Sequence, residues 1–116
     1  MPSAPTLFST LGLSEALLSS LAALNYTTPT PIQQQAIPAV LFGKDVLGIA
    51  DTGSGKTLSY ALPILQRLHE EKWTMPSRHV PVLVLVPTRE LAVQVETVFN
   101  EVSAGLPERV KTMAVF

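Results

Sequence analysis

One stretch of eight residues combines glycines, a lysine and a threonine at a spacing suited to binding phosphate. It reads Ala50-Asp51-Thr52-Gly53-Ser54-Gly55-Lys56-Thr57. Glycines let successive backbone N–H groups turn toward phosphate oxygens without side-chain clashes. Lys56 offers a positive charge to β- and γ-phosphates, and the Thr57 hydroxyl is suited to a Mg²⁺ ion that the nucleotide brings. We therefore expect all eight residues to contact a nucleotide, with Lys56 and Thr57 acting in catalysis.

Two positions in this loop depart from an ideal phosphate site. Ala50 stands where the usual pattern begins with glycine, and Asp51 places an acidic group near the phosphates. Such a charge is unfavourable beside phosphate unless the side chain points away, so we expect Asp51 to be an ordinary exposed loop residue. The alternative for the whole loop is a glycine-rich turn that happens to precede a helix. Its position between a predicted strand and a predicted helix favours phosphate binding.

The elements around the loop alternate between strands and helices. Apolar runs predict strands at 45–50, 80–86 and 109–116, and the unbroken run at 82–86 is typical of a parallel strand covered on both faces. Helical spacing predicts helices at 14–24, 56–70 and onward from Thr88. This order indicates an α/β fold with a parallel sheet flanked by helices.

Caps and breakers give the expected ends of these helices. Ser14 and Thr88 are predicted N-caps, and Asn25 can adopt the left-handed conformation of a helix end. Another helix should open at Thr30-Pro31, be interrupted at Pro38 and end at Gly43. Further breakers are Pro63, where a kink is expected, and Gly105 and Pro107, which should end the helix that begins at Thr88.

Composition sets limits on function. The chain has 116 residues, of which 47% are hydrophobic and 15% charged, so it can form a core and leaves little charge for its surface. The net charge of −1 gives no sign of a broad basic face, so we expect any nucleic acid to be held by a few aimed contacts or by chain outside this sequence. The absence of cysteine excludes disulfides and thiolate metal sites. We found no apolar run long enough to span a membrane and no secretory signal, which favours a cytoplasmic location.

Upstream of the loop, the segment Asn25-Tyr26-Thr27-Thr28-Pro29-Thr30-Pro31-Ile32-Gln33 resembles the Q motif of DEAD-box RNA helicases. In that family an aromatic residue stacks on adenine, a glutamine reads its edge, and an isolated aromatic precedes the motif at the distance of Phe8. The resemblance implies that Phe8, Tyr26, Thr28 and Gln33 contact the nucleotide. A glutamine amide matches adenine rather than guanine, which predicts ATP over GTP.

Each of these residues also has a purely structural interpretation. Gln33 lies three residues after Thr30 and can close a capping box on its own helix. Tyr26 can pack after the first helix, and Phe8 can pack the N-terminal segment. The family usually has glycine where this chain has Asn25, and both residues accept a left-handed conformation.

A third segment, Pro87-Thr88-Arg89-Glu90-Leu91-Ala92, matches a DEAD-box motif that contacts the RNA backbone. The resemblance implies that Pro87, Thr88 and Arg89 bind RNA without selecting its sequence. The structural alternative is an ordinary helix cap with a surface arginine.

The resemblance runs from about Phe8 to Phe116. It implies a RecA-like fold, with a lead-in at 1–13 and a partial ATP-binding domain at 14–116, and ATP and Mg²⁺ as cofactors. RNA, the remainder of this domain and a second RecA-like domain are the expected partners. The chain holds no Asp-Glu-Ala-Asp sequence, so we expect it to bind nucleotide and hydrolyse it poorly. The alternatives are a non-catalytic P-loop module and a DNA helicase or translocase core.

Overall fold

The computed structural model describes residues 7–51, 55–72, 80–108 and 110–116. Its elements are a 3-10 helix η1 (Phe8–Thr10) and four α-helices. These helices are α1 (Glu15–Ala23), α2 (Pro31–Leu41), α3 (Lys56–Glu70) and α4 (Arg89–Ser103). In the part of the chain that is described, no helix has the length and apolar character needed to cross a membrane.

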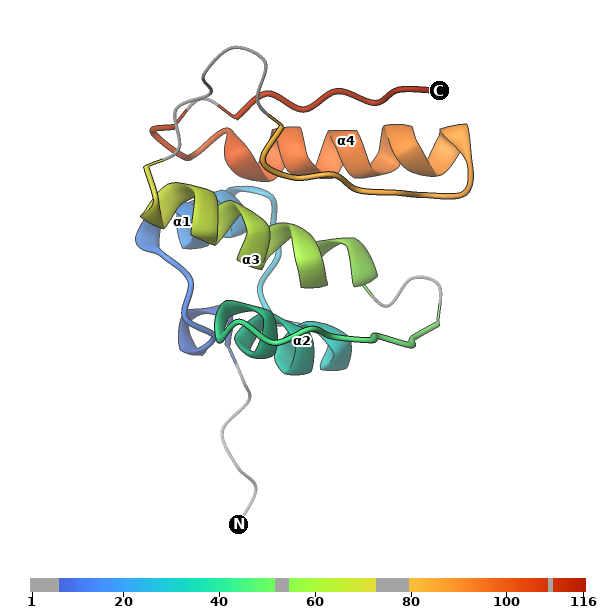
Figure 1. The fold of residues 1–116 in the computed structure, drawn as a ribbon. Coiled ribbons are helices and arrows are strands. Elements are labelled where there is room, and N and C mark those ends of the chain that lie inside the picture. The colour runs from blue at the N-terminus through green and yellow to red at the C-terminus, as the bar shows by residue number, and fades with distance from the viewer. Residues whose placement is uncertain (1–6, 52–54, 73–79, 109) are drawn as a thin grey trace.

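Helix α3 is the centre of the molecule, because it packs against α2 on one side and α4 on the other (Figure 1). Leu62 and Leu65 of α3 are fully buried, together with Leu17 of α1, Ile37 of α2 and Val102 of α4. Buried leucine and valine at helical spacing thus join all four helices into one apolar core.

The predicted helix starts are confirmed. The Ser14 hydroxyl accepts a hydrogen bond from Leu17 N at 3.4 Å, and the Thr88 hydroxyl accepts one from Leu91 N at 3.1 Å. Thr30 is the N-cap of α2, with Pro31 in the first turn. The Ser14 and Thr88 side chains supply partners for N–H groups that each helix itself leaves unpaired.

The ends of α1 and α2 follow one pattern. Asn25 has a φ of 64° and Gly43 a φ of 92°, the left-handed conformation expected after a helix. After α1, Tyr26 N donates to Leu21 O at 2.9 Å, and after α2, Lys44 N donates to Ala39 O at 3.1 Å. Both helices therefore close with a Schellman motif, and the predicted roles of Asn25 and Gly43 are confirmed.

The prediction that Pro38 interrupts the second helix is wrong. Helix α2 continues through Pro38 to Leu41, and α3 likewise passes through the fully buried Pro63. A proline removes one N–H from the helical ladder. The packing of Ala36 and Ile37 in the interior holds the remaining turns of α2 together.

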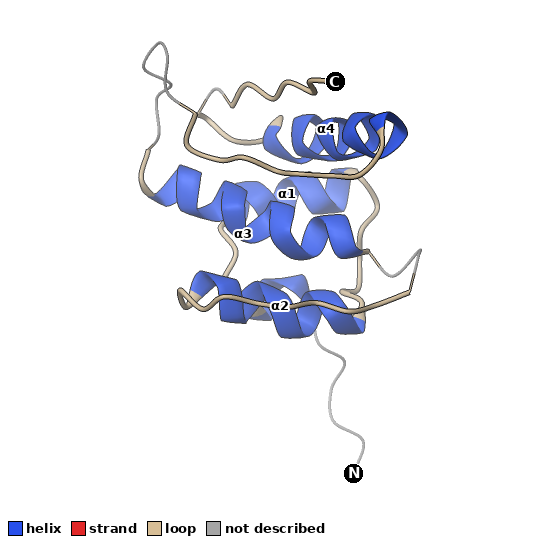
Figure 2. Ribbon diagram, turned by 45° about the vertical axis from the view of Figure 1, so that its right-hand side comes forward, coloured by secondary structure: helices blue, strands red, loops and turns tan. Residues whose placement is uncertain are grey.

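Three further segments lie as extended chains, at 45–51, 80–87 and 110–116, and the structure assigns no strand within the described ranges (Figure 2). They run in the same direction, and helices α2, α3 and α4 run back, as in a parallel α/β fold (Figure 1). Within the described residues, no backbone hydrogen bond joins one of these segments to another. A strand needs a hydrogen-bonded partner about 4.8 Å away. The expected strands therefore appear as extended segments with the expected direction, but without hydrogen bonds between them.

Burial along these segments corrects one more expectation. Val82, Val84 and Val86 are partly buried against the helices, whereas Leu83 and Leu85 are 77% and 84% exposed. The run 82–86 is therefore covered on one face, not on both. The same alternation appears near the C-terminus, where Met113 and Val115 are exposed. Period-two burial is what an extended chain on one layer of helices produces.

Candidate nucleotide-binding site

Apart from Phe8, the predicted site residues that the structure describes lie at one end of the molecule. The N-termini of α2, α3 and α4 all lie at this end, and the extended segments 45–51 and 80–87 finish there (Figure 1). Helix N-termini carry free N–H groups and the positive end of the helix dipole. In open α/β folds, ligands bind beyond the carboxyl ends of the strands. The end formed by these three N-termini is therefore suited to an anion.

The phosphate-binding residues lie around the start of α3. Gly55 is its N-cap with a φ of 80°, and Lys56 is its first residue and exposed. Thr57 is half-buried in the first turn, Ala50 is half-buried before the loop, and Asp51 is exposed. The exposure of Asp51 fits the interpretation that it points away from a ligand.

Thr52, Gly53 and Ser54 lie outside the described residues. Their predicted contacts with phosphate stay predictions. Residues 1–6 of the lead-in and Arg109, where the third strand is expected to begin, also lie outside the described residues.

Gln33 connects α2 to this loop. Its side chain is 3% exposed, and its Oε1 atom accepts a hydrogen bond from Thr30 N at 2.9 Å. Its Nε2 atom donates to Gly55 O at 3.1 Å. The bond to Thr30 N is the one that the capping-box interpretation predicts. The bond to Gly55 O connects the same side chain to the phosphate loop. Adenine contact by Gln33 stays a prediction.

Thr30 also lies at this site, although its position in the sequence predicts only a helix cap. Its hydroxyl is buried and finds no hydrogen-bond partner among the described residues. A Cβ atom placed on Gly55 would lie 3.3 Å from that hydroxyl and 2.3 Å from Gln33 Nε2. The start of α2 therefore packs closely against Gly55 and leaves no room for a side chain there. The capping box in the sequence was the signal available for this contact, although it gives no direction toward the loop.

The three remaining predicted nucleotide contacts differ in exposure. Phe8 is 4% exposed and belongs to the core, as in the packing alternative, so its contact with adenine is unsupported here and stays a prediction. Tyr26 is 40% exposed in the segment that joins α1 to α2, and Thr28 is exposed in the same segment. Of the two aromatic rings, only that of Tyr26 is open to solvent for stacking.

Pro87, Thr88 and Arg89 are all exposed at the start of α4. Thr88 caps the helix, which confirms the structural role. The Arg89 guanidinium lies 5.6 Å from the centre of the Phe116 ring, a cation–π distance. Arg89 thus stands at a helix N-terminus with its charge accessible, while RNA contact by these three residues stays a prediction.

The described residues bring together no group of three or more histidine, aspartate or glutamate side chains able to hold a metal ion. Near the loop, the half-buried Thr57 offers one hydroxyl oxygen. Such a residue fits a Mg²⁺ ion that is held mainly by nucleotide phosphates.

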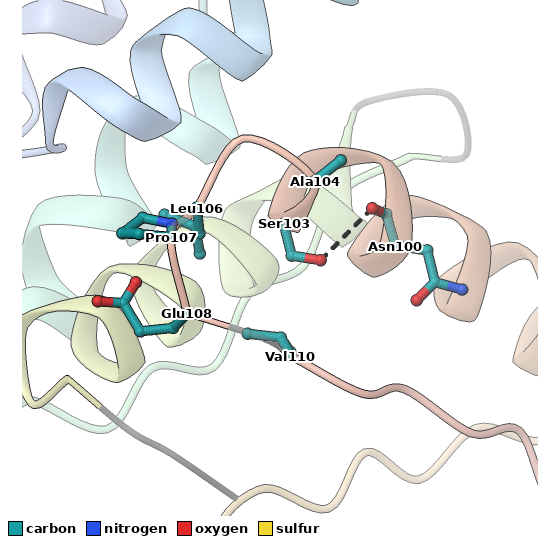
Figure 3. Close-up of a pocket in the computed structure, with 7 residues that line it drawn as sticks. All are labelled: Asn100, Ser103, Ala104, Leu106, Pro107, Glu108 and Val110. Atoms are coloured by element: carbon teal, nitrogen blue, oxygen red, sulfur yellow. Dashed lines mark hydrogen bonds between the residues drawn. The ribbon is translucent and has the colours of Figure 1, made fainter.

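A shallow open hollow of about 330 Å³ lies at the other end of α4 (Figure 3). It is lined by Asn100, Ser103, Ala104, Leu106, Pro107, Glu108 and Val110. None of these residues belongs to the predicted site. Glu108 is held there by His69 of α3, whose Nδ1 atom lies 2.7 Å from Glu108 Oε2. This contact fixes the turn after α4 to the last turn of α3.

The His69–Glu108 contact predicts a loss of stability in acid. The hydrogen bond with His69, aided by the charges of His69 and Lys72, lowers the pKa of Glu108 below its ordinary value. A carboxyl with a lowered folded pKa stabilises the fold above its unfolded pKa of about 4.3, and this contribution is lost as pH falls through the folded pKa. We expect Glu108→Gln to lower the melting temperature by roughly 1 to 4 °C at pH 6, with the difference vanishing near pH 3.

Thermal unfolding followed by circular dichroism between pH 3 and pH 7 measures this difference. Glu101→Gln, which removes an exposed carboxylate from α4, is the matched control and should show no such trend. A difference between wild type and Glu108→Gln that stays constant across the range contradicts the prediction.

The family model described as DEAD/DEAH box helicase matches residues 30–115. The chain is 48% identical over 102 residues to the ATP-dependent rRNA helicase RRP3 of Meyerozyma guilliermondii, covering 88% of the chain and 20% of that protein. It spans about a fifth of the length of the curated relatives that it matches with this similarity.

Two solved structures share the fold. A DEAD box protein from the hyperthermophile Methanococcus jannaschii superposes with a TM-score of 0.76 at 29% identity, over 93% of this chain and 28% of that one. The RNA-helicase Prp28 from Chaetomium thermophilum, bound to ADP, superposes with a TM-score of 0.74 at 37% identity, over 90% and 26%. These likenesses confirm the predicted RecA-like α/β fold class, with part of one such domain in this chain.

Proposed function

The chain belongs to the DEAD/DEAH box helicase family, and we propose that it is the nucleotide-binding part of an ATP-dependent RNA helicase. The observation that carries this proposal is the junction of the adenine-reading and phosphate-binding segments, where Gln33 donates to Gly55 O. The relative RRP3 is named an ATP-dependent rRNA helicase, which supports an ATP-dependent activity on RNA here.

In this proposal each end of the nucleotide has its own residues. Lys56 and the N–H groups at the start of α3 bind the phosphates, and Thr57 provides one ligand to the Mg²⁺ ion that they carry. Tyr26 stacks on the base, and the Gln33 amide distinguishes adenine from guanine. The metal supplies charge neutralisation on the phosphates when it is bound.

RNA has a separate place at the same end. Thr88 and Arg89 begin α4, so their N–H groups and guanidinium are suited to the RNA sugar–phosphate backbone. The rest of the first domain, a second RecA-like domain and the residues for efficient hydrolysis are the expected complements of this chain. In a complete helicase, ATP binding and hydrolysis then drive local separation of RNA strands.

Titration of the chain with ATP and with GTP, each with Mg²⁺, tests the proposal by isothermal calorimetry. We expect binding of ATP with an affinity about 10-fold or more above that for GTP, because guanine presents a carbonyl where adenine presents an amino group. Equal affinities would remove the adenine-reading role of Gln33. Absence of binding to either nucleotide would favour the non-catalytic P-loop alternative.

A further inference from the structure

The end of the last extended segment lies against the start of α4. Residues 110–116 run back along this helix, so that their final residues reach its N-terminus (Figure 1). The Glu96 side chain of α4 holds the segment there, because its Oε2 atom accepts a hydrogen bond from Ala114 N at 2.6 Å. The place of Phe116 is therefore set by a contact with the helix close to the end of the segment.

Alternation along this segment turns the Phe116 side chain toward α4. Thr112 and Ala114 are partly buried, whereas Met113 and Val115 are exposed. Successive side chains of an extended chain point to opposite faces, so Phe116 shares the face of Ala114. Phe116 is nevertheless 72% exposed, which fits a position beside the first turn of α4, where the helix begins.

The Phe116 ring lies beside a cation. The guanidinium carbon of Arg89 is 5.6 Å from the ring centre, within the range of a cation–π interaction. Arg89 is exposed as well, so both groups face solvent at the same end of the molecule. Single-stranded RNA is bound by pairs of this kind, in which a base stacks on an aromatic ring and a cation meets a phosphate.

The charge of the chain gives a stacking contact particular weight. Lysine and arginine number 8, against 9 aspartate and glutamate residues, so the sequence gives no sign of a broad attraction for RNA. Stacking needs no net positive charge, because the base and the ring interact through their faces. An exposed ring at the start of α4 therefore supplies affinity that the charge of the chain does not.

We propose that Phe116, placed by Glu96 and flanked by Arg89, is an RNA-binding residue on which one base of a single strand stacks. This role rests on the proposed helicase function and extends it, because the start of α4 is assigned there only to the sugar–phosphate backbone. Every base has a face that can stack, so the contact selects no sequence. Its consequence is that part of the RNA affinity depends on the presence of bases.

A short single-stranded RNA of mixed sequence and the same ribose–phosphate chain without bases are the two probes. Phe116→Leu keeps an apolar side chain and removes the ring. We expect it to weaken binding of the normal RNA about 3- to 10-fold in fluorescence anisotropy titrations, and to leave binding of the abasic chain unchanged.

Phe42→Leu is the matched control. Phe42 is 82% exposed, and Lys44 Nζ lies 5.9 Å from its ring centre. This is the same kind of pair at the end of α2, on the opposite end of the molecule from the start of α4 (Figure 1). Binding of both probes should equal that of wild type.

Glu96→Met tests the placement of the ring. It removes the acceptor for Ala114 N, and Glu101→Met makes the same change in charge at an exposed position of α4. Loss of a carboxylate favours RNA in both variants, so only their difference reports on Phe116. We expect the preference for normal over abasic RNA to fall about 2- to 5-fold in Glu96→Met and to persist in Glu101→Met.

Salt dependence separates the ring from the cation beside it. Arg89→Met removes a phosphate contact, so the slope of log affinity against log salt concentration should become smaller by about 1. Phe116→Leu should lower the affinity at every salt concentration and leave the slope unchanged.

The outcomes distinguish this proposal from the function on which it rests. If the chain binds RNA and Phe116→Leu affects both probes equally, or neither, no base stacks on this ring, and the proposal is overturned while RNA binding at α4 stands. If wild type binds neither probe, the proposal falls together with the RNA-binding part of the function, and the ATP titration still decides the nucleotide-binding part.

Discussion

Gly55→Ala is expected to lower the free energy of unfolding by about 2 to 5 kcal/mol and to reduce ATP affinity at least about 10-fold. Gly55 has a φ of 80°, a conformation that an alanine Cβ disfavours by about 1 to 2 kcal/mol. The added Cβ would also lie 2.3 Å from Gln33 Nε2. Either the Gln33–Gly55 bond breaks or the loop moves, and both disturb the start of α3.

Gly43→Ala separates these two effects. Gly43 has a φ of 92°, but a Cβ placed there meets nothing within 4 Å. We expect this variant to show only the conformational part, about 1 to 2 kcal/mol, with unchanged ATP affinity. Urea unfolding and ATP titration of both variants make the comparison. Equal losses of stability at positions 55 and 43 would mean that contact with Gln33 does not constrain the loop.

Local signals in the sequence predicted the helices well, because each signal has a partner close along the chain. Ser14 and Thr88 bond to N–H groups three residues on, and Asn25 and Gly43 close helices through their own backbone. Such interactions depend on the residue types at short spacing and little on the rest of the fold.

Contacts between distant segments were less accessible to sequence. The apolar runs at 45–50 and 80–86 predict extended chain, which the structure has, but not which segment would pair with it. Because proline lacks an N–H, the sequence predicts a break at Pro38, whereas burial of the neighbouring Ala36 and Ile37 keeps α2 continuous. Tertiary packing overrides a local preference at such positions.

Gln33 shows how a motif can hold two meanings. The spacing of Thr30 and Gln33 predicted either a capping box or an adenine reader, and nothing in the spacing chose between them. The structure shows the capping bond and adds a bond to Gly55, which is 22 positions away along the chain. That second contact depends on how α2 packs against α3, so it follows from the fold and not from either motif alone.

Lys56→Ala is expected to weaken ATP binding about 10- to 100-fold and to leave the free energy of unfolding within about 0.5 kcal/mol of wild type. Lys56 is exposed at the first position of α3, so its ammonium group contributes little to packing. A positive charge at a helix N-terminus is mildly unfavourable without an anion. Pairing with phosphate would offset this unfavourable interaction.

Lys111→Ala is the control for charge alone, because it makes the same change in net charge at an exposed position of the C-terminal segment. ATP titration should distinguish the two variants by at least about 10-fold, since salt screens long-range electrostatics strongly and a direct ammonium–phosphate contact much less. The pair also complements the glycine variants: Gly55→Ala should lower stability and affinity together, whereas Lys56→Ala should lower affinity alone. A Lys56→Ala chain that binds ATP like wild type would place the phosphates away from the start of α3 and contradict the proposed site.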